Sequence, residues 1–489
     1  MKTKQKIIKF SVFFIFLLLP IIDCIRRTPI KDVEILGISI IELVFLIPVA
    51  LSFLITITKI KKKELIPIII YSLVLLIYII FHSLNIINFD ESIFFRTNIN
   101  IIKETFYIIR TFYFPVLFLF VLCKNKDILD MNFYKKIIKM LIVLISFSIV
   151  ILNIFKLSFA TYQEKNFFID YNIFDFYKSD LSYKLLSTRG WFNSANEISA
   201  ILTTLLPINI YYLFKENKKN NYILYAVQVI SMIILGTRVS TYCSILISAF
   251  FIFINIFSKF YQKEKINYKF IIVAVLCCSY YFLSPVGNYY MTNEQPYYPS
   301  NDEHYSNLKD LNDEEAIEYI KSNLYHFRIK EFFVELYPIE NDIEFWKSVA
   351  LGDRNENNNS RLMKIKIINR FKERNNNKYD TFLGIGYTTN FEDLERDYVY
   401  QYYIFGIIGL IIIILPEIIL LLKSTLNILK KFKKINITLT CMLLSSPYIC
   451  LVCAYLSGHV LGYISPMYTL ILTLGILSVM INNTIKKEN

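Results

Sequence analysis

Long runs of apolar residues constrain this chain more than any other feature of its sequence. About twelve runs approach the roughly 17 to 25 apolar residues that a helix needs to cross the hydrocarbon core of a bilayer. These runs predict an all-α, polytopic membrane protein with about twelve transmembrane helices. They lie near residues 7–23, 35–57, 65–84, 106–123, 137–156, 192–214, 222–236, 239–257, 270–284, 398–422, 436–457 and 462–482.

The first run is expected to stay in the protein as a membrane anchor. Lysines precede it, as they do in a signal peptide, but no small-x-small cleavage site follows. Ile22, Asp23 and Cys24 occupy the place where such a site would stand. We therefore predict an uncleaved first helix.

Basic residues predict the orientation of the helices. If twelve helices alternate in direction, every cluster of lysine and arginine falls on the same side, which is the cytoplasmic side by the positive-inside rule. The sequence thus predicts a multi-pass protein of the cell membrane with cytoplasmic N- and C-termini. The formal net charge of +13 belongs to these loops and does not indicate nucleic-acid binding. The clusters lie at the N-terminus and near 59–63, 124–136, 215–219, 259–269, 423–434 and 486–487.

The opposite, extracytoplasmic side is expected to carry two sizeable loops. One lies near 157–190, and a larger, net negative one spans 285–397. The larger loop contains amphipathic stretches at 311–327 and 361–371, where apolar residues recur at near-helical spacing. An Asn-rich segment at 355–359 predicts a flexible break. The expected organisation is therefore helices one to nine in 1–284, the large loop in 285–397, and helices ten to twelve in 398–489.

Four arginines are candidates for binding an anionic substrate. Arg189, Arg238 and Arg361 lie at outer helix ends or in the large loop, and Arg110 lies inside the fourth helix. The planar fork of donors on arginine suits phosphate and pyrophosphate oxygens. Each arginine near an interface also has the alternative of reaching toward water as a snorkelling side chain. We predict that Arg189, Arg238 and Arg361 converge on one outer cavity, with Arg110 beneath it.

The segment that opens the sixth run is unusually polar for the edge of a membrane. Ser194 and Glu197 have the spacing of a helix capping box, which is their structural interpretation. Asn196 and Glu197 fall just inside the predicted membrane boundary, where each polar group needs a partner. Asn196 and Glu197 are therefore further candidates for substrate binding.

A series of short motifs runs in order through residues 185–412. Its residues are Gly190, Phe192, Asn196 and Leu202, then Gly236-Thr-Arg-Val-Ser240, Asn359-Ser-Arg361, Leu383-Gly-Ile-Gly-Tyr387 and Gly406-Ile-Ile-Gly409. In this topology the series, which is more specific than any one of its motifs, resembles the bacterial O-antigen polymerase and ligase family.

The resemblance implies a reaction on a lipid-linked glycan outside the cytoplasm. A sugar hydroxyl attacks the anomeric carbon of a glycan held on undecaprenyl pyrophosphate, and fixed cations stabilise the leaving pyrophosphate. The attacking hydroxyl needs a base. Many relatives carry a His-Asn pair where this sequence has Glu395, followed by Asp397. Glu395 is thus the predicted base, Asp397 shapes its field or orients the acceptor, and His459 is an alternative source of a base.

We therefore predict a glycosyltransferase that polymerises lipid-linked repeat units into a surface polysaccharide. A ligase that transfers glycan to a lipid or wall acceptor is a close alternative, and a glycolipid flippase or secondary transporter is another. No metal motif and no cofactor motif are apparent. The expected partners are the undecaprenyl-pyrophosphate-linked oligosaccharide, membrane lipids, and a chain-length regulator and flippase of the same pathway.

Overall fold

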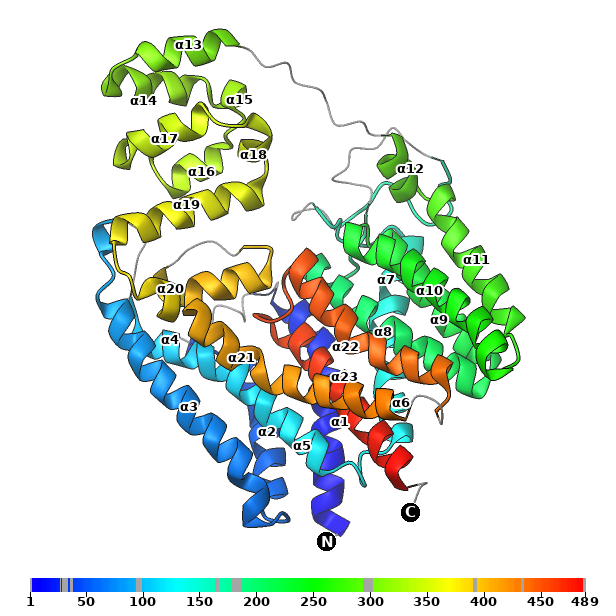
Figure 1. Ribbon diagram of the computed structural model, residues 1–489. Coiled ribbons are helices and arrows are strands. Elements are labelled where there is room, and N and C mark those ends of the chain that lie inside the picture. The colour runs from blue at the N-terminus through cyan, green and yellow to red at the C-terminus, as the bar shows by residue number, and fades with distance from the viewer. Residues whose placement is uncertain are drawn as a thin grey trace. The chain divides into compact units, whose positions relative to one another are not determined.

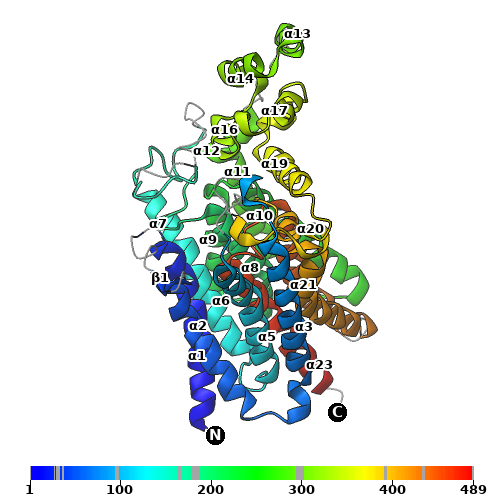
Figure 2. The ribbon, with the colours of Figure 1, turned by 90° about the vertical axis from the view of Figure 1, so that its left-hand side faces the viewer.

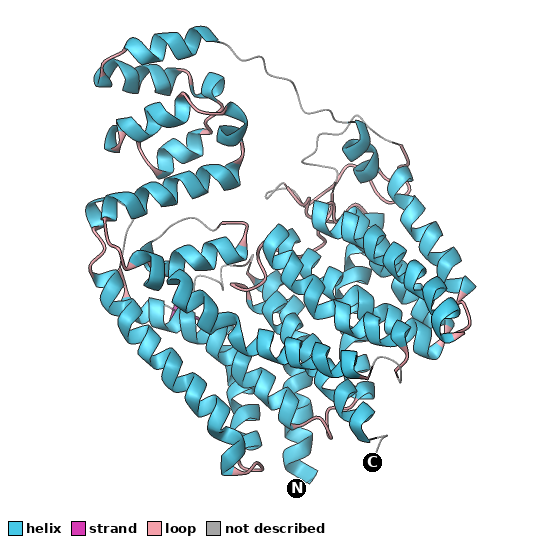
Figure 3. Cartoon of the chain, viewed as in Figure 1, coloured by secondary structure: helices cyan, strands magenta, loops and turns pink. Residues whose placement is uncertain are grey.

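The computed structural model describes nearly the whole chain, and it is helical almost throughout (Figure 3). The described strands are a two-residue pair, β1 (Glu34–Ile35) with β2 (Ile38–Ser39), and an isolated bridge joins Ala160 to Thr188. The predicted all-α class is confirmed. The described residues are 2–26, 28, 34–35, 38–93, 99–162, 167–177, 187–292, 302–389, 394–431 and 435–486.

Each of the twelve predicted runs contains a described helix. Fewer than twelve of the described helices are long and apolar enough to cross a membrane. Ten of the described helices meet that requirement, or eleven if the pair Tyr268–Leu283 and Pro285–Met291, bent by 64°, counts as one span. The predicted count of about twelve differs because α9 (Lys219–Ile234) has only 16 residues. That length is just below the roughly 17 residues that a span requires.

The chain divides into two compact units. The first comprises Met1–Leu73, Ile108–Asn293 and Ile413–Asn489, and the second comprises Val74–Tyr107 and Glu294–Ile412. The predicted division at residues 285 and 397 concerns the membrane and stays a prediction.

The first unit is a bundle in which α8 (Ala195–Glu216) is buried along most of its length. It packs against α22 (Ile437–Leu456), α9 and α10 (Arg238–Gln262). Small and polar side chains on α8, among them Ser199 and Thr203, are buried there, and small residues allow helices to approach closely.

The remaining helices of the first unit surround this centre. Figure 2 shows α1 rising from the N-terminus beside α2, and these two helices are in contact. The N-terminus and the end of α23 lie at the same end of this unit (Figure 1). The bounds are α1 Lys2–Ile25, α2 Ile40–Ile57, α5 Phe114–Lys124, α6 Met131–Ile142, α7 Ser148–Ile154, α11 Tyr268–Leu283, α12 Pro285–Thr292 and α23 Ile464–Lys486, with π-helical segments η3 Ile109–Tyr113 and η4 Val143–Phe147.

Two long helices are divided between the units, and Ile108, the last residue of α4 (Ile101–Ile108), also belongs to the first unit. Residues 62–73 of α3 (Lys62–Ile87) belong to the first unit and the rest to the second. In α21 (Asp397–Lys430) the residues up to Ile412 belong to the second unit. Gly406 interrupts α21 with a φ of 65°, which is a left-handed conformation that favours glycine.

The second unit contains a layered group of short helices from the large predicted loop (Figure 1). Phe327, Trp346 and Phe371 are fully or almost fully buried and form part of its core. The predicted amphipathic stretches are helical, as α14 with α15 and as α19. The bounds are α4 Ile101–Ile108, α13 Asp302–Asp310, α14 Asp313–Ser322, α15 Leu324–Phe327, α16 Glu331–Leu336, α17 Ile343–Ala350, α18 Arg354–Asn358, α19 Ser360–Asn375 and α20 Asp380–Leu383, with 3-10 turns η2 Glu91–Ile93, η6 Ile339–Asn341 and η7 Tyr387–Thr389.

The flexible break predicted at 355–359 is wrong. Residues 354–358 form α18, and Asn359 caps α19 by accepting hydrogen bonds from the backbone of Arg361 and Leu362. Asn357 is buried and its amide donates to the backbone oxygens of Phe327 and Val349. Asparagine is frequent in loops because its side chain can hydrogen-bond to backbone groups in place of other backbone groups. Here such hydrogen bonds stabilise the turn between α18 and α19.

Candidate functional site

An ion pair joins α1 to the start of α8 in the first unit. Arg26 follows α1 and donates two hydrogen bonds to the Glu197 carboxylate, at 2.9 and 3.0 Å. The Glu197 side chain is only 1% exposed, whereas that of Arg26 is 22% exposed. The carboxylate of Glu197 is the main cause that raises the pKa of Arg26, and Asp23 and Glu42 add to it. Arg26 therefore has three carboxylates around it.

The predicted capping role of Ser194 is confirmed. Its side chain accepts a hydrogen bond from the backbone of Glu197, so Ser194 is the N-cap of α8. The Glu197 carboxylate is also the partner of Arg26, which answers the expectation that this polar group needs a partner. Asn196 lies half-buried beside it in the first turn of α8.

The same region fastens the segment before α8 to α1. Asp23 is fully buried and accepts a hydrogen bond of 2.6 Å from the backbone nitrogen of Asn193. Arg189 is buried and donates to the backbone oxygen of Asn193 at 2.7 Å. The backbone nitrogen and the backbone oxygen of Asn193 are therefore both hydrogen-bonded, one to Asp23 and the other to Arg189.

Arg110 also finds a carboxylate within the first unit. It lies in η3 and forms an ion pair with Glu42 in the first turn of α2. Both side chains are mostly buried, at 15% and 16% exposed. This agrees with the expectation that a charge within a span faces the protein interior.

His459 is connected to Arg26, the partner of Glu197, through the ring of Tyr463. Its ring packs edge-on against Tyr463 with 4.7 Å between centroids, and Arg26 lies over the Tyr463 ring at 5.9 Å. His459 has a φ of 60° in the turn after α22. Seven residues of the first unit thus form one group, which we call the arginine cluster. Four of them are predicted from the sequence, namely Arg110, Arg189, Glu197 and His459. The other three are Asp23, Arg26 and Glu42.

Arg238 begins a helix whose N-terminus packs against α8 and the segment before it. It is the first residue of α10, after the N-cap Thr237, whose hydroxyl donates to Ser199 on α8 at 3.0 Å. A side chain at Gly236 would collide with Ser187, so this glycine allows close approach of the two segments. The Arg238 side chain is exposed and forms no ion pair with a residue that the structure describes.

In the second unit, two predicted residues form an ion pair. Arg361 at the start of α19 donates through Nε and Nη2 to one oxygen of Glu395, at 2.9 and 2.7 Å. Both side chains are partly open to solvent, at 34% and 47% exposed. Asp397 is buried in the first turn of α21, where a carboxylate is stabilised by the helix dipole. Arg110, Arg189 and Arg238 belong to the first unit, so the predicted convergence with Arg361 stays a prediction.

The second unit also holds a buried network that sequence reasoning missed. His82 on α3 and Glu104 on α4 are both 0% exposed, and their side chains meet at 3.0 Å. The two oxygens of Glu104 accept hydrogen bonds from the backbone nitrogens of Tyr387 and Thr388, each at 2.9 Å. The other ring nitrogen of His82 lies 2.6 Å from the backbone oxygen of Leu383. His82 and Glu104 therefore hydrogen-bond to the first and the last residue of the Leu383–Tyr387 motif.

Two glycine motifs from the large loop and α21 interlock in this unit. Gly384 has a φ of 84°, and a side chain there would lie 2.0 Å from the backbone oxygen of Ile404. A side chain at Gly406 would lie 2.3 Å from the backbone of Phe382. Tyr78 on α3 closes the contact by donating to the backbone oxygen of Phe405 at 2.8 Å. Because they lack side chains, Gly384 and Gly406 allow the backbones of the two motifs to pack closely against each other.

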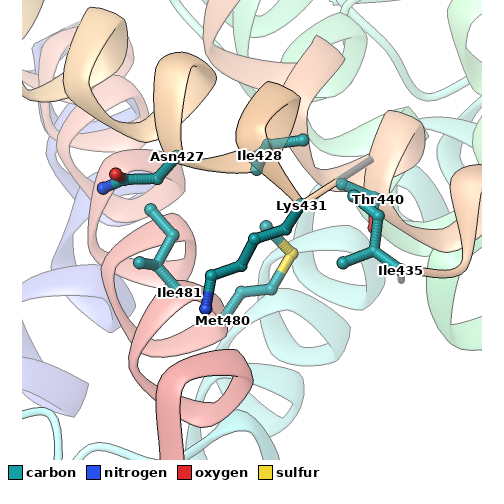
Figure 4. Close-up of a pocket in the computed structure, with 7 residues that line it drawn as sticks. All are labelled: Asn427, Ile428, Lys431, Ile435, Thr440, Met480 and Ile481. Carbon is teal, nitrogen blue, oxygen red and sulfur yellow. The ribbon is translucent and has the colours of Figure 1, made fainter. Parts of the chain in front are cut away.

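Two cavities described in the first unit are lined by no residue of the arginine cluster. Figure 4 shows one of about 80 Å³ between the end of α21, the start of α22 and the end of α23, with the Lys431 side chain extending toward Met480 and Ile481. A second, of about 500 Å³, adjoins it. Neither is lined by a predicted site residue. Among the described side chains, no three His, Cys, Asp or Glu residues group in a way that could hold a metal ion.

Comparison with known proteins identifies a family for this chain. Residues 4–486 match the family described as O-antigen ligase like membrane protein. A search of curated proteins gave no match. The match covers nearly the whole chain, both units included, and bears out the resemblance seen in the short motifs. The chain belongs to the O-antigen ligase like family of membrane proteins.

Proposed function

We propose that the chain is a membrane glycosyltransferase that polymerises oligosaccharide repeat units carried on undecaprenyl pyrophosphate. Its family indicates glycan transfer in polysaccharide assembly. The product would be a surface polysaccharide such as a capsule, made on the extracytoplasmic face. The Arg361–Glu395 pair carries this proposal, because it sets a fork of cationic donors beside a carboxylate.

The proposed step forms one glycosidic bond and breaks another carbon–oxygen bond. The hydroxyl of one saccharide attacks the anomeric carbon of the next, and undecaprenyl pyrophosphate leaves with the bonding electrons. Glu395 accepts the hydroxyl proton, and Arg361 supports the negative charge that develops on the pyrophosphate. Arg361 occupies one oxygen of Glu395. The attacking hydroxyl therefore has to use the other oxygen, or donor binding has to draw Arg361 away first.

The arginine cluster has a supporting part in this proposal. Arg110, Arg189 and Glu197 would bind or orient the lipid-linked substrate, together with Asn196 and Arg238. Arg238 is exposed and has no carboxylate partner among the described residues, so its charge is the most available of these for an added anion. Asp397 would orient the acceptor, and His459 would be the next candidate for the base.

A test requires purified protein, the lipid-linked repeat unit and a gel that separates chain lengths. Glu395→Gln keeps the size of the side chain but removes its basicity, so the rate of chain growth should fall by about a hundred- to ten-thousand-fold. Donor binding should stay near the wild-type level. Arg361→Lys should weaken donor binding instead, because lysine lacks the fork.

Glu356→Gln is the matched control. Glu356 is a half-exposed carboxylate of the second unit that pairs with Lys366, and its substitution should leave chain growth unchanged. A normal rate for Glu395→Gln would reject Glu395 as the base and move the search to Asp397 and His459. Chelation of divalent metals should leave the wild-type rate unchanged, since the proposed step uses side chains alone.

A ligase is the second candidate, and the family description favours it directly. A ligase would move a finished glycan to a different lipid or wall acceptor. The two functions separate in the same assay. Chain growth from the lipid-linked repeat unit alone supports the polymerase, whereas transfer that needs an added acceptor supports the ligase. Movement of the substrate across a vesicle membrane without a new glycosidic bond would instead support a flippase or transporter.

A further inference from the structure

The cavity of about 500 Å³ at the end of the first unit that carries both termini has an unusual lining. Three lysines face one carboxylate: Lys124, Lys126 and Lys423 against Glu64. Lys124 is paired with Glu64 at 3.1 Å. Within the part of the chain that the structure describes, Lys126 and Lys423 form no ion pair. The cavity therefore has two uncompensated positive charges.

The position of these lysines matches the edge of a membrane. Lys124 is the last residue of α5, Glu64 is in the first turn of α3, and Lys423 lies near the end of α21. α3 and α21 are each long and apolar enough to cross a bilayer, and α5 ends the helical stretch Ile101–Lys124, which meets the same requirement. A ligand in this cavity would thus sit where the headgroups of lipids sit.

The neighbouring cavity in Figure 4 adds an apolar compartment. It shares Asn427 and Ile481 with the basic cavity, and Ile428, Ile435 and Met480 line the rest of it together with Lys431 and Thr440. A charged compartment beside an apolar one suits an amphiphile with a negative head. Lysine binds phosphate as a point charge, and the Asn427 amide supplies a neutral donor beside it.

We propose that this basic cavity binds the phosphate headgroup of an anionic phospholipid. Basic pockets between membrane helices are suited to such headgroups. The proposal concerns the end of the first unit opposite to the arginine cluster and is independent of the glycosyltransferase activity. It commits to a lipid, and a free phosphate ion is the competing source of the same chemistry.

The experiment uses the full-length protein in a neutral detergent. Thermal unfolding is followed while dioleoylphosphatidylglycerol, dioleoylphosphatidylcholine or inorganic phosphate is added. A ligand that binds the folded state raises the unfolding temperature, and the rise grows with the ratio of ligand concentration to dissociation constant. Only the phosphatidylglycerol should do so at micromolar concentration. Equal effects of both lipids, or an effect of phosphate alone, would overturn the proposal.

Substitutions then locate the site. Lys126→Gln with Lys423→Gln should raise the half-saturating concentration of phosphatidylglycerol by about 30-fold, at about fivefold per lysine. Lys126→Arg with Lys423→Arg keeps the charges and should retain binding, which separates loss of the site from loss of folding. The control is Lys265→Gln with Lys269→Gln, two exposed lysines, one between α10 and α11 and one in the first turn of α11. If the control pair weakens binding as much as the cavity pair, surface charge alone attracts the lipid and the cavity is not its site.

Discussion

The two units use buried charge in different ways. In the first unit, charged side chains from separate helices pair with one another, as Arg26 does with Glu197 and Arg110 with Glu42. In the second unit, a carboxylate holds the backbone of a loop, since Glu104 accepts hydrogen bonds from Tyr387 and Thr388. The first arrangement leaves the arginines partly exposed, whereas the second is closed to solvent.

This difference separates groups that can change partners from groups that fix a shape. Arg110 and its partner Glu42 are both partly exposed, at 15% and 16%, so Arg110 can exchange its carboxylate for a substrate anion at a lower cost than a fully buried pair can. A pair at 0% exposure cannot open without leaving a charge or a polar group buried and unsatisfied. We therefore expect substitutions in the second unit's network to act on folding, and those in the arginine cluster to act on both folding and binding.

The largest effect is expected for Glu104→Leu. This change leaves His82 and two backbone N–H groups without their acceptor in a closed site, and breaking a buried pair from one side costs about 3 to 5 kcal/mol. The free energy of unfolding is measured by chemical denaturation in detergent with circular dichroism. Glu344→Gln is the control, because the Glu344 side chain is 87% exposed. A loss below about 1 kcal/mol would erase the distinction between the two units.

A double-mutant cycle on Arg26 and Glu197 should give the next largest effect. Arg26→Ala leaves the buried Glu197 carboxylate without its main cation and should cost about 2 kcal/mol, less than a fully buried pair because Arg26 is partly exposed. Glu197→Gln in the Arg26→Ala background should recover part of that loss. The coupling energy should fall between about 0.5 and 3 kcal/mol. Additive losses would mean that the pair is not coupled and that the contrast with the second unit is misplaced.

Asp342 tests whether a buried carboxylate whose cationic partner is partly exposed behaves like Glu104. It caps α17 through the Phe345 backbone and accepts hydrogen bonds from Arg370 and Tyr337. Burial alone would raise the pKa of Asp342, but the hydrogen bonds from Arg370 and Tyr337 outweigh it and hold the pKa below its ordinary value. A carboxyl whose pKa is lower in the folded state stabilises the fold above its unfolded pKa and loses that contribution as the pH falls.

The expected result is a loss of about 1 to 2 kcal/mol of local stability below about pH 4. The fluorescence of Trp346 reports this loss, because its buried indole donates a hydrogen bond to the backbone of Tyr337. The chain has two tryptophans, so the measurement uses a Trp191→Phe background in which Trp346 is the one that remains. Asp342→Asn should remove the acid-dependent part of the loss. The same acid profile with and without Asp342 would show that another group carries it.

The smallest effect on stability is expected for a cysteine at Asn358, which tests the predicted side of the large loop. Asn358 is exposed, whereas its neighbour Asn357 is buried. Asn358→Cys should react with an impermeant thiol reagent on intact cells, above the labelling of the unsubstituted protein. Asn357→Cys should stay unreactive in the folded protein, and Lys265→Cys should react only after lysis. Labelling of Asn358→Cys only after lysis would reverse the predicted topology.

The sequence predicts the helices because the length of an apolar run and its flanking residues are local properties. The capping role of Ser194 is predicted from spacing alone and is confirmed. The amphipathic helices of the large loop are predicted from periodicity, since their apolar residues recur on one face. The prediction fails at Asn359, because asparagine can break a chain or cap a helix, and the residues after it decide between the two roles.

The site is harder to predict because its partners come from distant parts of the chain. Arg26 and Asp23 flank the first apolar run, yet they contact a segment about 170 residues later. His82 lies inside the run 65–84, and Glu104 stands two residues before the run 106–123. An ionisable residue within or beside a span needs a partner, so this histidine and this glutamate, at successive runs, are candidates for each other.

The π-helical turn at Ile109–Tyr113 has a consequence for the history of this chain. A π turn contains one residue more than the α turn that it replaces, so it has the form of a single-residue insertion that the helix absorbed without changing direction. Arg110 lies within that turn. Relatives that lack the arginine are expected to lack one residue here as well, and an alignment would then show a one-position gap at 109–113 flanked by helices of unchanged length.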